Sequence, residues 1–178
     1  INMKHNILIT GGAGFIGYHL CQYLLSQGDC RIDIVDNLSR GKFDREFSLL
    51  TKRPNVKFFK ADLTDYESFG LLKKKYDYIY HLSAIVGVGN VAQHPEQVLY
   101  VNILSILNLL RWIKQKQSAL KGLLFASTSE VYAGTLKHYS LKIPTNEEVN
   151  ICLEDIASRR STYALSKIAG ESACMNYF

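Results

Sequence analysis

A glycine-rich turn between two apolar segments constrains the fold of this chain most. The turn is Thr10–Gly17, with glycine at positions 11, 12, 14 and 17. Asn6–Ile9 before it predicts a strand, and apolar residues at helical spacing after it predict a helix. Gly11 permits a tight reversal, Gly14 lets the backbone approach a pyrophosphate, and Gly17 lets the helix lie close to the strand. The unpaired N–H groups at the start of such a helix are suited to binding phosphates.

An acidic residue follows the second predicted strand, Arg31–Val35. Asp36 lies about 20 residues beyond the glycine turn, where a carboxylate can accept hydrogen bonds from the adenosine ribose. A carboxylate there repels a 2′-phosphate, so NAD is favoured over NADP, although Arg40 keeps NADP open. The alternative for Asp36 and Asn37 is a turn-forming role alone.

Three further predicted strands continue an alternation of strand and helix. Strands are predicted over 56–59, 78–80 and 122–126, helices over 66–75 and about 96–115, and a loop over 85–92. Asp62, after the third strand, either binds the adenine amino group or caps the helix that begins near Asp65. The alternation specifies an α/β fold with a doubly wound parallel sheet, the Rossmann fold, whose ligand site lies at the carboxyl strand ends.

Two of these segments carry further expectations. The helix over 96–115 is apolar on nearly every side, which predicts burial against the sheet and against a neighbouring helix or a partner subunit. His81 ends the fourth strand and is interpreted as a packed or hydrogen-bonded structural histidine rather than a base. The sheet is left with an open edge after the fifth strand, so we expect a homodimer.

Composition argues against several other classes of function. Of the 178 residues, 47% are hydrophobic and 21% charged, as in an ordinary globular domain. The net charge of +5 is scattered, with Lys73–Lys75 as the longest run, and predicts no nucleic-acid binding. The four cysteines form no metal-binding or CxxC pattern, which favours reduced thiols in a cytoplasmic protein without a metal. The most apolar window, 98–113, is too short to span a membrane.

A tyrosine and a lysine four residues apart provide the candidate chemistry. Tyr163 and Lys167 lie on one face of a predicted helix. A cation near a phenol lowers its pKa, and such a phenol can take a proton from a sugar hydroxyl as hydride leaves the same carbon. Thr128, at the end of the fifth predicted strand, can orient that oxygen. The pair alone is common on exposed helices, and its place after a nucleotide-binding sheet is what favours catalysis.

With these residues the chain resembles the extended short-chain dehydrogenase/reductase family, in particular its NAD-dependent nucleotide-sugar epimerases and dehydratases. The matching segments are Thr10–Gly17, Asp36–Leu38, Asp62–Leu63, His81–Ala84, Asn102, Ser127–Tyr132 and Tyr163–Lys167. The resemblance implies NAD as the cofactor and a nucleotide sugar as the substrate. In such enzymes NAD oxidises the sugar transiently and NADH returns the hydride, so the cofactor is not consumed.

The resemblance also implies which residues would bind the cofactor. The pyrophosphate would contact the glycine turn, at Gly11, Gly14, Phe15, Ile16 and Gly17. The adenosine would contact Asp36 and Asn37 through its ribose, and Asp62 and Leu63 through its adenine. Leu82, Ser83 and Ala84 would line the cofactor, and Asn102 would be a structural or water-binding residue near the nicotinamide.

The same resemblance implies the catalytic roles. Tyr163 would be the base, Lys167 would hold the nicotinamide ribose and tune Tyr163, and Thr128 would orient the sugar hydroxyl. Glu130 is either a second acid/base group, since Thr-Ser-Glu-Val-Tyr is similar to UDP-glucuronate decarboxylases, or a structural hydrogen-bond partner. Dehydratases carry Asp-Glu where this chain has Ser-Glu, so we expect an epimerase first, a decarboxylase second and a 4,6-dehydratase third. The family also has glycine where this chain has Ala133.

Length sets the expected extent of the domain. Family members run to about twice this length, with sugar-nucleotide contacts largely in a C-terminal segment. We expect residues 3–178 to be the NAD-binding domain, without the substrate-binding part and inactive alone, and residues 1–2 to be an expression remnant. The alternative from another class is a non-catalytic NAD-binding sensor or scaffold. The presence of Thr128, Tyr163 and Lys167 argues against it.

Overall fold

The computed structural model describes residues 5–72 and 75–177. The expected remnant, the start of the domain at Met3, most of the lysine run and Phe178 lie outside these described residues. The chain divides into two compact units. The sheet unit joins Ile1–Ser83 with Ser105–Ala126, and the helical unit joins Ala84–Leu104 with Ser127–Phe178.

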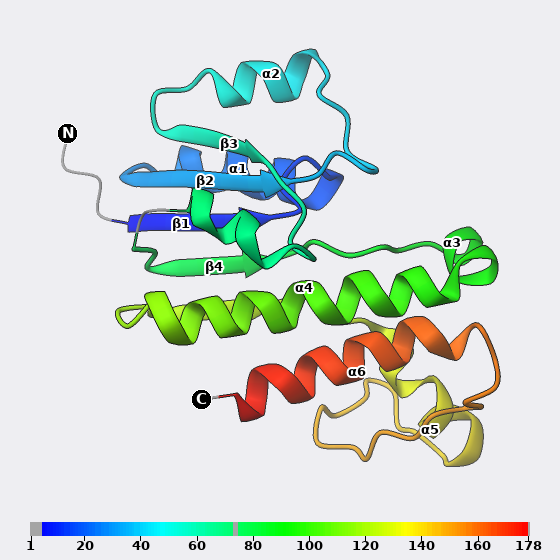
Figure 1. Cartoon of the computed structure of the whole chain (residues 1–178). Helices are drawn as coiled ribbons and strands as arrows, with labels where there is room; N and C mark the ends of the chain where they lie inside the picture. Colours follow the sequence, from blue (N-terminus) through cyan, green and yellow to red (C-terminus); the bar gives the residue numbers. More distant parts are fainter. Residues whose placement is uncertain (1–4, 73–74, 178) are drawn as a thin grey trace. The chain divides into compact units, whose positions relative to one another are not determined.

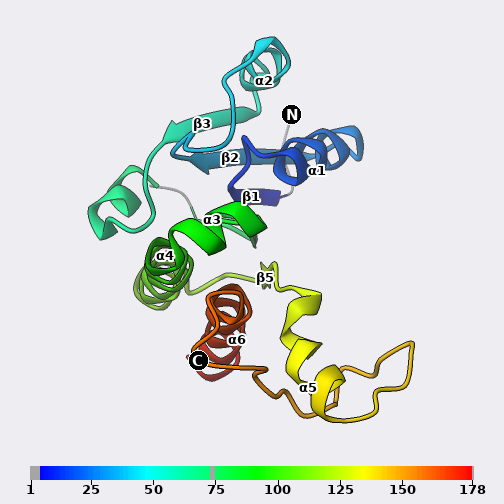
Figure 2. The same cartoon turned by 90° about the vertical axis from the view of Figure 1, so that its right-hand side faces the viewer.

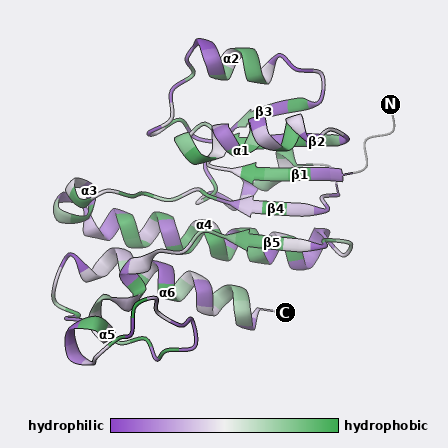
Figure 3. Ribbon diagram, turned by 180° about the vertical axis from the view of Figure 1, so that it is seen from behind, coloured by the Kyte–Doolittle hydropathy of each residue, from purple (hydrophilic) through white to green (hydrophobic). Residues whose placement is uncertain are grey.

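Five parallel strands form the sheet unit, as predicted. Their bounds are β1 His5–Thr10, β2 Cys30–Asp36, β3 Val56–Lys60, β4 Tyr78–His81 and β5 Gly122–Phe125. The spatial order is β3-β2-β1-β4-β5, and every neighbouring pair is parallel; β1 to β4 can be followed in Figure 1, and Figure 3 adds β5. The intervening helical segments are α1 Phe15–Ser26, α2 Arg45–Thr51, the 3₁₀ helix η1 Tyr66–Leu71, α3 Val88–Gln93 and α4 Pro95–Lys116. The doubly wound α/β sheet expected from the sequence is therefore confirmed.

Alternate residues of the central strands face two different layers, because successive side chains of a strand point to opposite faces. Ile32 and Ile34 pack on one face with Phe47 of α2 in an apolar cluster. Between them Asp33 faces the other layer, where its carboxylate accepts a hydrogen bond of 2.7 Å from the Tyr76 hydroxyl. Figure 2 shows α1 on one side of the sheet and η1 on the other. In Figure 3, β1 is hydrophobic along most of its length, as expected for a strand covered on both faces.

The helical unit contains mostly short helices. Besides α3 and the beginning of α4 it has η2 Ser129–Tyr132, α5 Ala133–His138 and α6 Ser161–Asn176. In the described part of the chain, no helix combines the length and hydrophobicity that a bilayer-spanning segment needs.

Two expectations about helices are wrong in detail, and a third stays open. Of the segment over 66–75, Tyr66–Leu71 forms a 3₁₀ helix that ends before Leu72, which adopts φ −93° and ψ 89°, since Gly70 favours helix poorly; residues 73–74 lie outside the described part of the chain. The predicted loop over 85–92 contains α3. For α4, the expected covering was the sheet and a neighbouring helix or a partner subunit; in the single chain Tyr100 and Leu107 have 60% and 40% of their surfaces accessible, and the partner-subunit alternative stays a prediction. These two residues lie seven positions apart and so share one face, and Figure 3 shows hydrophilic bands along the same helix.

Candidate functional site

Close packing excludes a Cβ from three positions of the glycine turn in the sheet unit, Gly11, Gly12 and Gly17. Gly11 has φ +70°, and a Cβ there would lie 2.7 Å from the Ser83 nitrogen and 2.8 Å from the Leu82 carbonyl carbon. A Cβ at Gly17 would lie 2.5 Å from the Gly11 oxygen. The turn therefore packs directly against the segment after β4, which brings Gly11, Leu82 and Ser83 together. The pyrophosphate role of Gly14, which precedes α1, stays a prediction.

The N-terminus of α1 offers a site for a negative charge. No side chain caps the helix, and its first turn contains no acidic residue. This end of the helix carries the partial positive charge of the helix dipole, and its first backbone N–H groups are those of Phe15 and Ile16. No carboxylate within the first turn balances that charge. The side chains of both residues are exposed, by 81% and 68%. These features fit a dinucleotide pyrophosphate held through the backbone.

Asp36 is held at the edge of the glycine turn. Its Oδ2 accepts a hydrogen bond of 3.1 Å from the Ala13 N–H, and its Oδ1 accepts one of 2.8 Å from the Leu38 N–H. The bond from the Leu38 N–H is the turn-forming role that the sequence offered as the alternative for Asp36. A carboxylate can accept about four hydrogen bonds, so capacity remains for a ribose diol. Asp36 thus fits the ribose role, which stays a prediction.

Asn37 and Asp62 lie together after β2 and β3. The Asn37 amide donates a hydrogen bond of 3.2 Å to Asp62 Oδ2, and Thr64 donates two more to Oδ1 from its N–H and its hydroxyl. Burial raises the pKa of the Asp62 carboxyl, but these hydrogen bonds outweigh it and leave the pKa below its usual value. Asp65, not Asp62, caps η1, by accepting a bond from the Glu67 N–H. The capping alternative for Asp62 is therefore wrong, and its neighbour Leu63 is buried.

His81 is a structural histidine, as interpreted from the sequence. It is buried, its Nδ1 lies 2.9 Å from the Thr10 hydroxyl, and its ring stacks on Phe125. The same hydroxyl accepts a hydrogen bond of 3.3 Å from the Ser83 N–H. Thr10 was not singled out from the sequence as a site residue. Its position opposite His81 in the parallel register, which a sequence alone does not define, is what gives it this role.

In the helical unit, Lys167 and Tyr163 occupy one side of α6. Lys167 is only 4% exposed, and its Nζ lies 5.8 Å from the centre of the Tyr163 ring. Burial lowers the pKa of Lys167 to about 8. Burial and the nearby Glu130 carboxylate raise the pKa of Tyr163 above its ordinary value. This direction is opposite to the expected one, because the burial of the phenol and the Glu130 carboxylate both disfavour the phenolate.

Thr128 and Glu130 lie at the start of η2. Thr128 caps this helix, since its hydroxyl oxygen accepts a hydrogen bond of 3.3 Å from the Glu130 N–H. The hydroxyl proton of Thr128 is not used in that bond and can be donated to a substrate oxygen. The Glu130 carboxylate is close enough to Tyr163 to influence its pKa. Both arrangements are compatible with the implied roles, which remain predictions.

Asn102 connects the segment after β4 to α6. It is 3% exposed, its Oδ1 accepts a hydrogen bond of 2.7 Å from the Ile85 N–H, and its Nδ2 donates to the Ile85 oxygen at 3.1 Å. The Nδ2 also donates to Ser166 Oγ at 3.1 Å, and that hydroxyl donates to the Tyr163 carbonyl at 2.7 Å. Of the two roles implied for Asn102, these bonds fit the structural one. Ala84 directly precedes Ile85.

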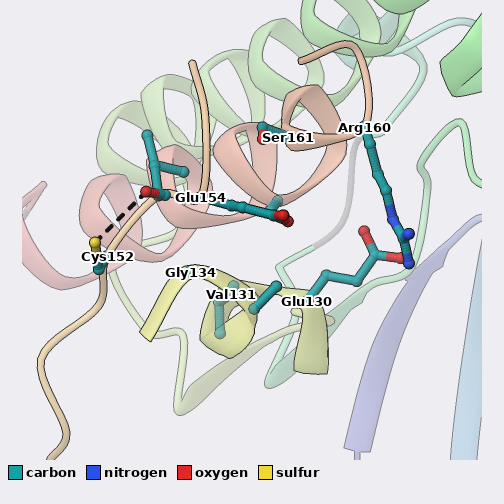
Figure 4. A pocket seen from close by; sticks show the side chains of 10 residues that line it. Glu130, Val131, Gly134, Cys152, Glu154, Arg160 and Ser161 are labelled. Atoms are coloured by element: carbon teal, nitrogen blue, oxygen red, sulfur yellow. Dashed lines mark hydrogen bonds between the residues drawn. The ribbon is translucent and has the colours of Figure 1, made fainter. Parts of the chain in front are cut away.

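A pocket of about 140 Å³ lies in the same unit (Figure 4). Ten residues line it, namely Glu130, Val131, Ala133, Gly134, Cys152, Leu153, Glu154, Arg160, Ser161 and Ala164. A Cβ at Gly134 would lie 1.9 Å from the Cys152 carbonyl oxygen, so this position requires glycine. Ala133, where the chain departs from the family pattern, begins α5 directly after η2. Arg160 was not singled out from the sequence, and only the fold brings it to the pocket.

The chain matches one protein family over most of its length and is similar to individual nucleotide-sugar enzymes. The family described as GDP-mannose 4,6 dehydratase matches residues 8–178. UDP-N-acetyl-alpha-D-glucosaminuronate decarboxylase of Bacillus cytotoxicus is 34% identical, over 98% of this chain and 50% of that protein. UDP-glucuronate 4-epimerase of Thermodesulfobacterium geofontis is 35% identical, over 78% of this chain and 44% of that protein.

A solved structure extends the similarity to the fold. The Bordetella bronchiseptica enzyme WbmF, crystallised in complex with NAD+, matches with a TM-score of 0.76 and 26% identity, over 99% of this chain and 46% of that one. The chain thus spans 50% or less of the length of these three relatives. Its match to the family over residues 8–178 confirms the resemblance seen in the sequence. Homologues of the chain include epimerases, decarboxylases and dehydratases of nucleotide sugars. The chain belongs to the GDP-mannose 4,6 dehydratase family of extended short-chain dehydrogenases/reductases.

Proposed function

We propose that this chain is the NAD-binding part of a nucleotide-sugar epimerase, which oxidises one sugar hydroxyl transiently and reduces it again. The observation that supports this most is the burial of Lys167 one helical turn from the half-buried phenol of Tyr163. A buried ammonium is costly, and a protein that only binds a dinucleotide has no need of one beside a tyrosine. This argues for the enzyme over the sensor or scaffold.

The sheet unit supports NAD as the cofactor. The uncapped N-terminus of α1 would hold the pyrophosphate, and Asp36 would hold the adenosine ribose. Gly11 lets the turn pack on the segment after β4, and Gly14 leaves no Cβ where the pyrophosphate would approach the backbone. A 2′-phosphate would meet the Asp36 carboxylate, which favours NAD over NADP.

The helical unit would supply the proton chemistry. Bound NAD would accept the hydride from the sugar carbon and return it. Tyr163 would take the proton of the reacting hydroxyl at its phenolic oxygen and give it back in the second half of the cycle. Lys167, with a pKa of about 8, would carry the compensating positive charge, and Thr128 would donate its hydroxyl proton to the same sugar oxygen.

A decarboxylase is the second candidate. It is favoured by the 34% identity to the Bacillus cytotoxicus decarboxylase and by the Glu130 carboxylate near Tyr163. A dehydratase is third, because Ser129 stands where an acid would help to expel a hydroxyl. We also propose a homodimer, supported by β5 at the edge of the sheet, where Leu124 is exposed.

The test separates cofactor binding from turnover. Calorimetric titration of the chain with NAD measures the first. The gene product at its natural length is then incubated with NAD and a panel of UDP-, GDP-, CDP- and dTDP-sugars, with Tyr163→Phe as the inactive control. A product of unchanged mass with altered stereochemistry by NMR supports the epimerase. Loss of carbon dioxide identifies a decarboxylase and loss of water a dehydratase, and either result overturns the proposal.

A further inference from the structure

The positive charge of the chain is concentrated in one segment of the sheet unit. Residues 37–60 contain seven of the 21 basic residues and two of the 16 acidic ones, so they carry the whole net charge of +5. The two acidic residues are Asp44, which caps α2, and Glu46 in the first turn of that helix. The remaining residues of the sequence together carry no net charge. This concentration corrects the expectation that the net charge is scattered.

One side of α2 presents this charge to solvent. The buried residues of the helix are Phe47 and Leu50. Arg45, Leu49 and Lys52, at helical spacings of four and three residues, lie on the opposite side and are exposed. Figure 1 shows α2 beside β3, the strand at one edge of the sheet. The outward side of α2 is therefore basic with an apolar residue at its centre.

The residues that flank α2 extend the same surface. The Phe58 ring of β3 packs on Phe47 with 5.3 Å between ring centres, so Phe58 faces α2. Lys60 lies two residues later on the strand and shares that side, because the side chains of a strand alternate. Phe43 packs on both rings and remains 52% exposed. We name this surface the α2 face and define it by Phe43, Arg45, Leu49, Lys52, Arg53 and Lys60.

We propose that the α2 face docks on a membrane surface that contains anionic lipids. This inference is independent of the proposed function. The negative head groups complement the charge of the face, and each lysine or arginine close to such a surface strengthens binding about fivefold. Leu49 is 56% exposed, and together with Phe43 it can enter the boundary between head groups and acyl chains.

Two other occupants fit the α2 face less well. A nucleic-acid backbone complements the charge, but it offers no apolar counterpart for Leu49. A second copy of the chain would have to bring a different, acidic surface to the α2 face, and such a head-to-tail contact continues into open chains unless it closes as a ring. Of the three occupants, the anionic lipid surface matches both the charge and the apolar side chains.

Lys57 provides a matched control on the neighbouring strand. It is exposed like Lys52, but strand alternation places it on the side of β3 away from Phe58. Its Nζ lies 4.6 Å from the centre of the Phe59 ring on that side. Lys52→Gln and Lys57→Gln therefore change the net charge equally, and only the first changes the α2 face.

The experiment measures sedimentation of the natural-length protein with lipid vesicles. One set of vesicles is phosphatidylcholine alone, and the other contains about 30% phosphatidylserine in phosphatidylcholine. We expect at least tenfold stronger binding to the anionic vesicles in about 0.1 M NaCl, and loss of that binding in about 1 M NaCl, because salt screens exposed charges. Lys52→Gln should weaken binding about fivefold and Lys57→Gln less than twofold. Leu49→Ala, which keeps the charge and favours helix, should weaken it about threefold.

Equal binding to the two kinds of vesicle, or binding to neither, overturns the proposal. So does an equal loss in Lys52→Gln and Lys57→Gln, because general net charge would then explain the binding. Unchanged binding by Leu49→Ala also overturns it, because the apolar contact would then be absent. The same variants are titrated with a DNA duplex and followed by light scattering without lipid. Tighter binding to DNA than to the anionic vesicles, or self-association that Lys52→Gln abolishes, assigns the α2 face to another occupant and overturns the proposal.

Discussion

Replacing Asn102 by alanine should loosen the helix that carries Tyr163 and Lys167. The side chain makes three hydrogen bonds, two with the backbone of Ile85 and one with Ser166 Oγ. Alanine removes all three and leaves a buried N–H, a carbonyl and a hydroxyl short of a partner. At about 1 kcal/mol for each bond, the free energy of unfolding should fall by about 3 kcal/mol. Asn102→Asp keeps the acceptor for the Ile85 N–H but cannot donate, and should cost about 2 kcal/mol.

Asn108 offers a control on the same helix. Its amide donates hydrogen bonds of 3.0 Å to the Leu63 and Thr64 carbonyls, within the sheet unit. Asn108→Ala should therefore destabilise the chain by about 2 kcal/mol without touching α6. In the natural-length protein, at a temperature where all variants are folded, Asn102→Ala should lower kcat/KM at least tenfold, and Asn108→Ala should not.

The assay combines urea unfolding followed by circular dichroism with hydrogen exchange. The Ile85 amide should lose protection in Asn102→Ala and keep it in Asn108→Ala, because only Asn102 accepts its hydrogen bond. The reasoning is refuted if two results are found together. The free energy of unfolding of Asn102→Ala would lie within about 1 kcal/mol of the unmutated value, which is the contribution of about one hydrogen bond, and the Ile85 amide would stay protected.

Three further predictions concern Gly134, Lys167 and Asp36. Gly134→Ala should cost about 1–3 kcal/mol in urea unfolding, because the new Cβ would lie 1.9 Å from the Cys152 oxygen. Gly89→Ala, with no atom within 4 Å, should cost nothing, and similar losses for both would contradict this. Burial lowers the pKa of Lys167 from 10.5 to about 8, so the unfolded chain holds that proton more tightly than the folded chain. Burying the charged lysine therefore lowers the free energy of unfolding below pH 8, and this loss is recovered as the pH rises from 8 to 10.5. Lys167→Met should thus stabilise the chain below pH 8, by up to about 3 kcal/mol, and lose this advantage near pH 10.5; an advantage that does not change with pH would count against it. Asp36→Ala should weaken NAD binding at least tenfold in calorimetry, and unchanged affinity would remove Asp36 from the ribose site.

The sheet could be predicted because its signals are local. Each strand is a short apolar run bounded by polar or glycine residues, and the alternation with helices leaves few other arrangements. The need for glycine at position 11 follows from a backbone conformation that other residues rarely adopt, and the structure confirms it with φ +70°. The predicted site residues lie at the carboxyl ends of these strands, so their positions follow once the strands are predicted.

Helix length and exposure could not be predicted in the same way. The end of η1 at Leu71 depends on a local balance between Gly70 and the residues after it. The exposed face of α4 at Tyr100 and Leu107 depends on what packs beside the helix, and an apolar pattern does not contain that information. The direction of the Tyr163 pKa shift depends on burial and on Glu130, which lies 33 residues away in the chain.

The sequence by itself determined the strand segments and their alternation with helices, the glycine turn, and the pairing of Tyr163 with Lys167 on one helix, since each of these depends on residues within a few positions of each other. Only the tertiary structure decided that Asn102 binds Ile85 and Ser166, which are 17 and 64 residues away. It also decided that Arg160 lines the same pocket as Glu130 (Figure 4). Such partners are chosen by the packing of distant segments, because a buried polar group bonds to whichever donor or acceptor the fold brings within reach.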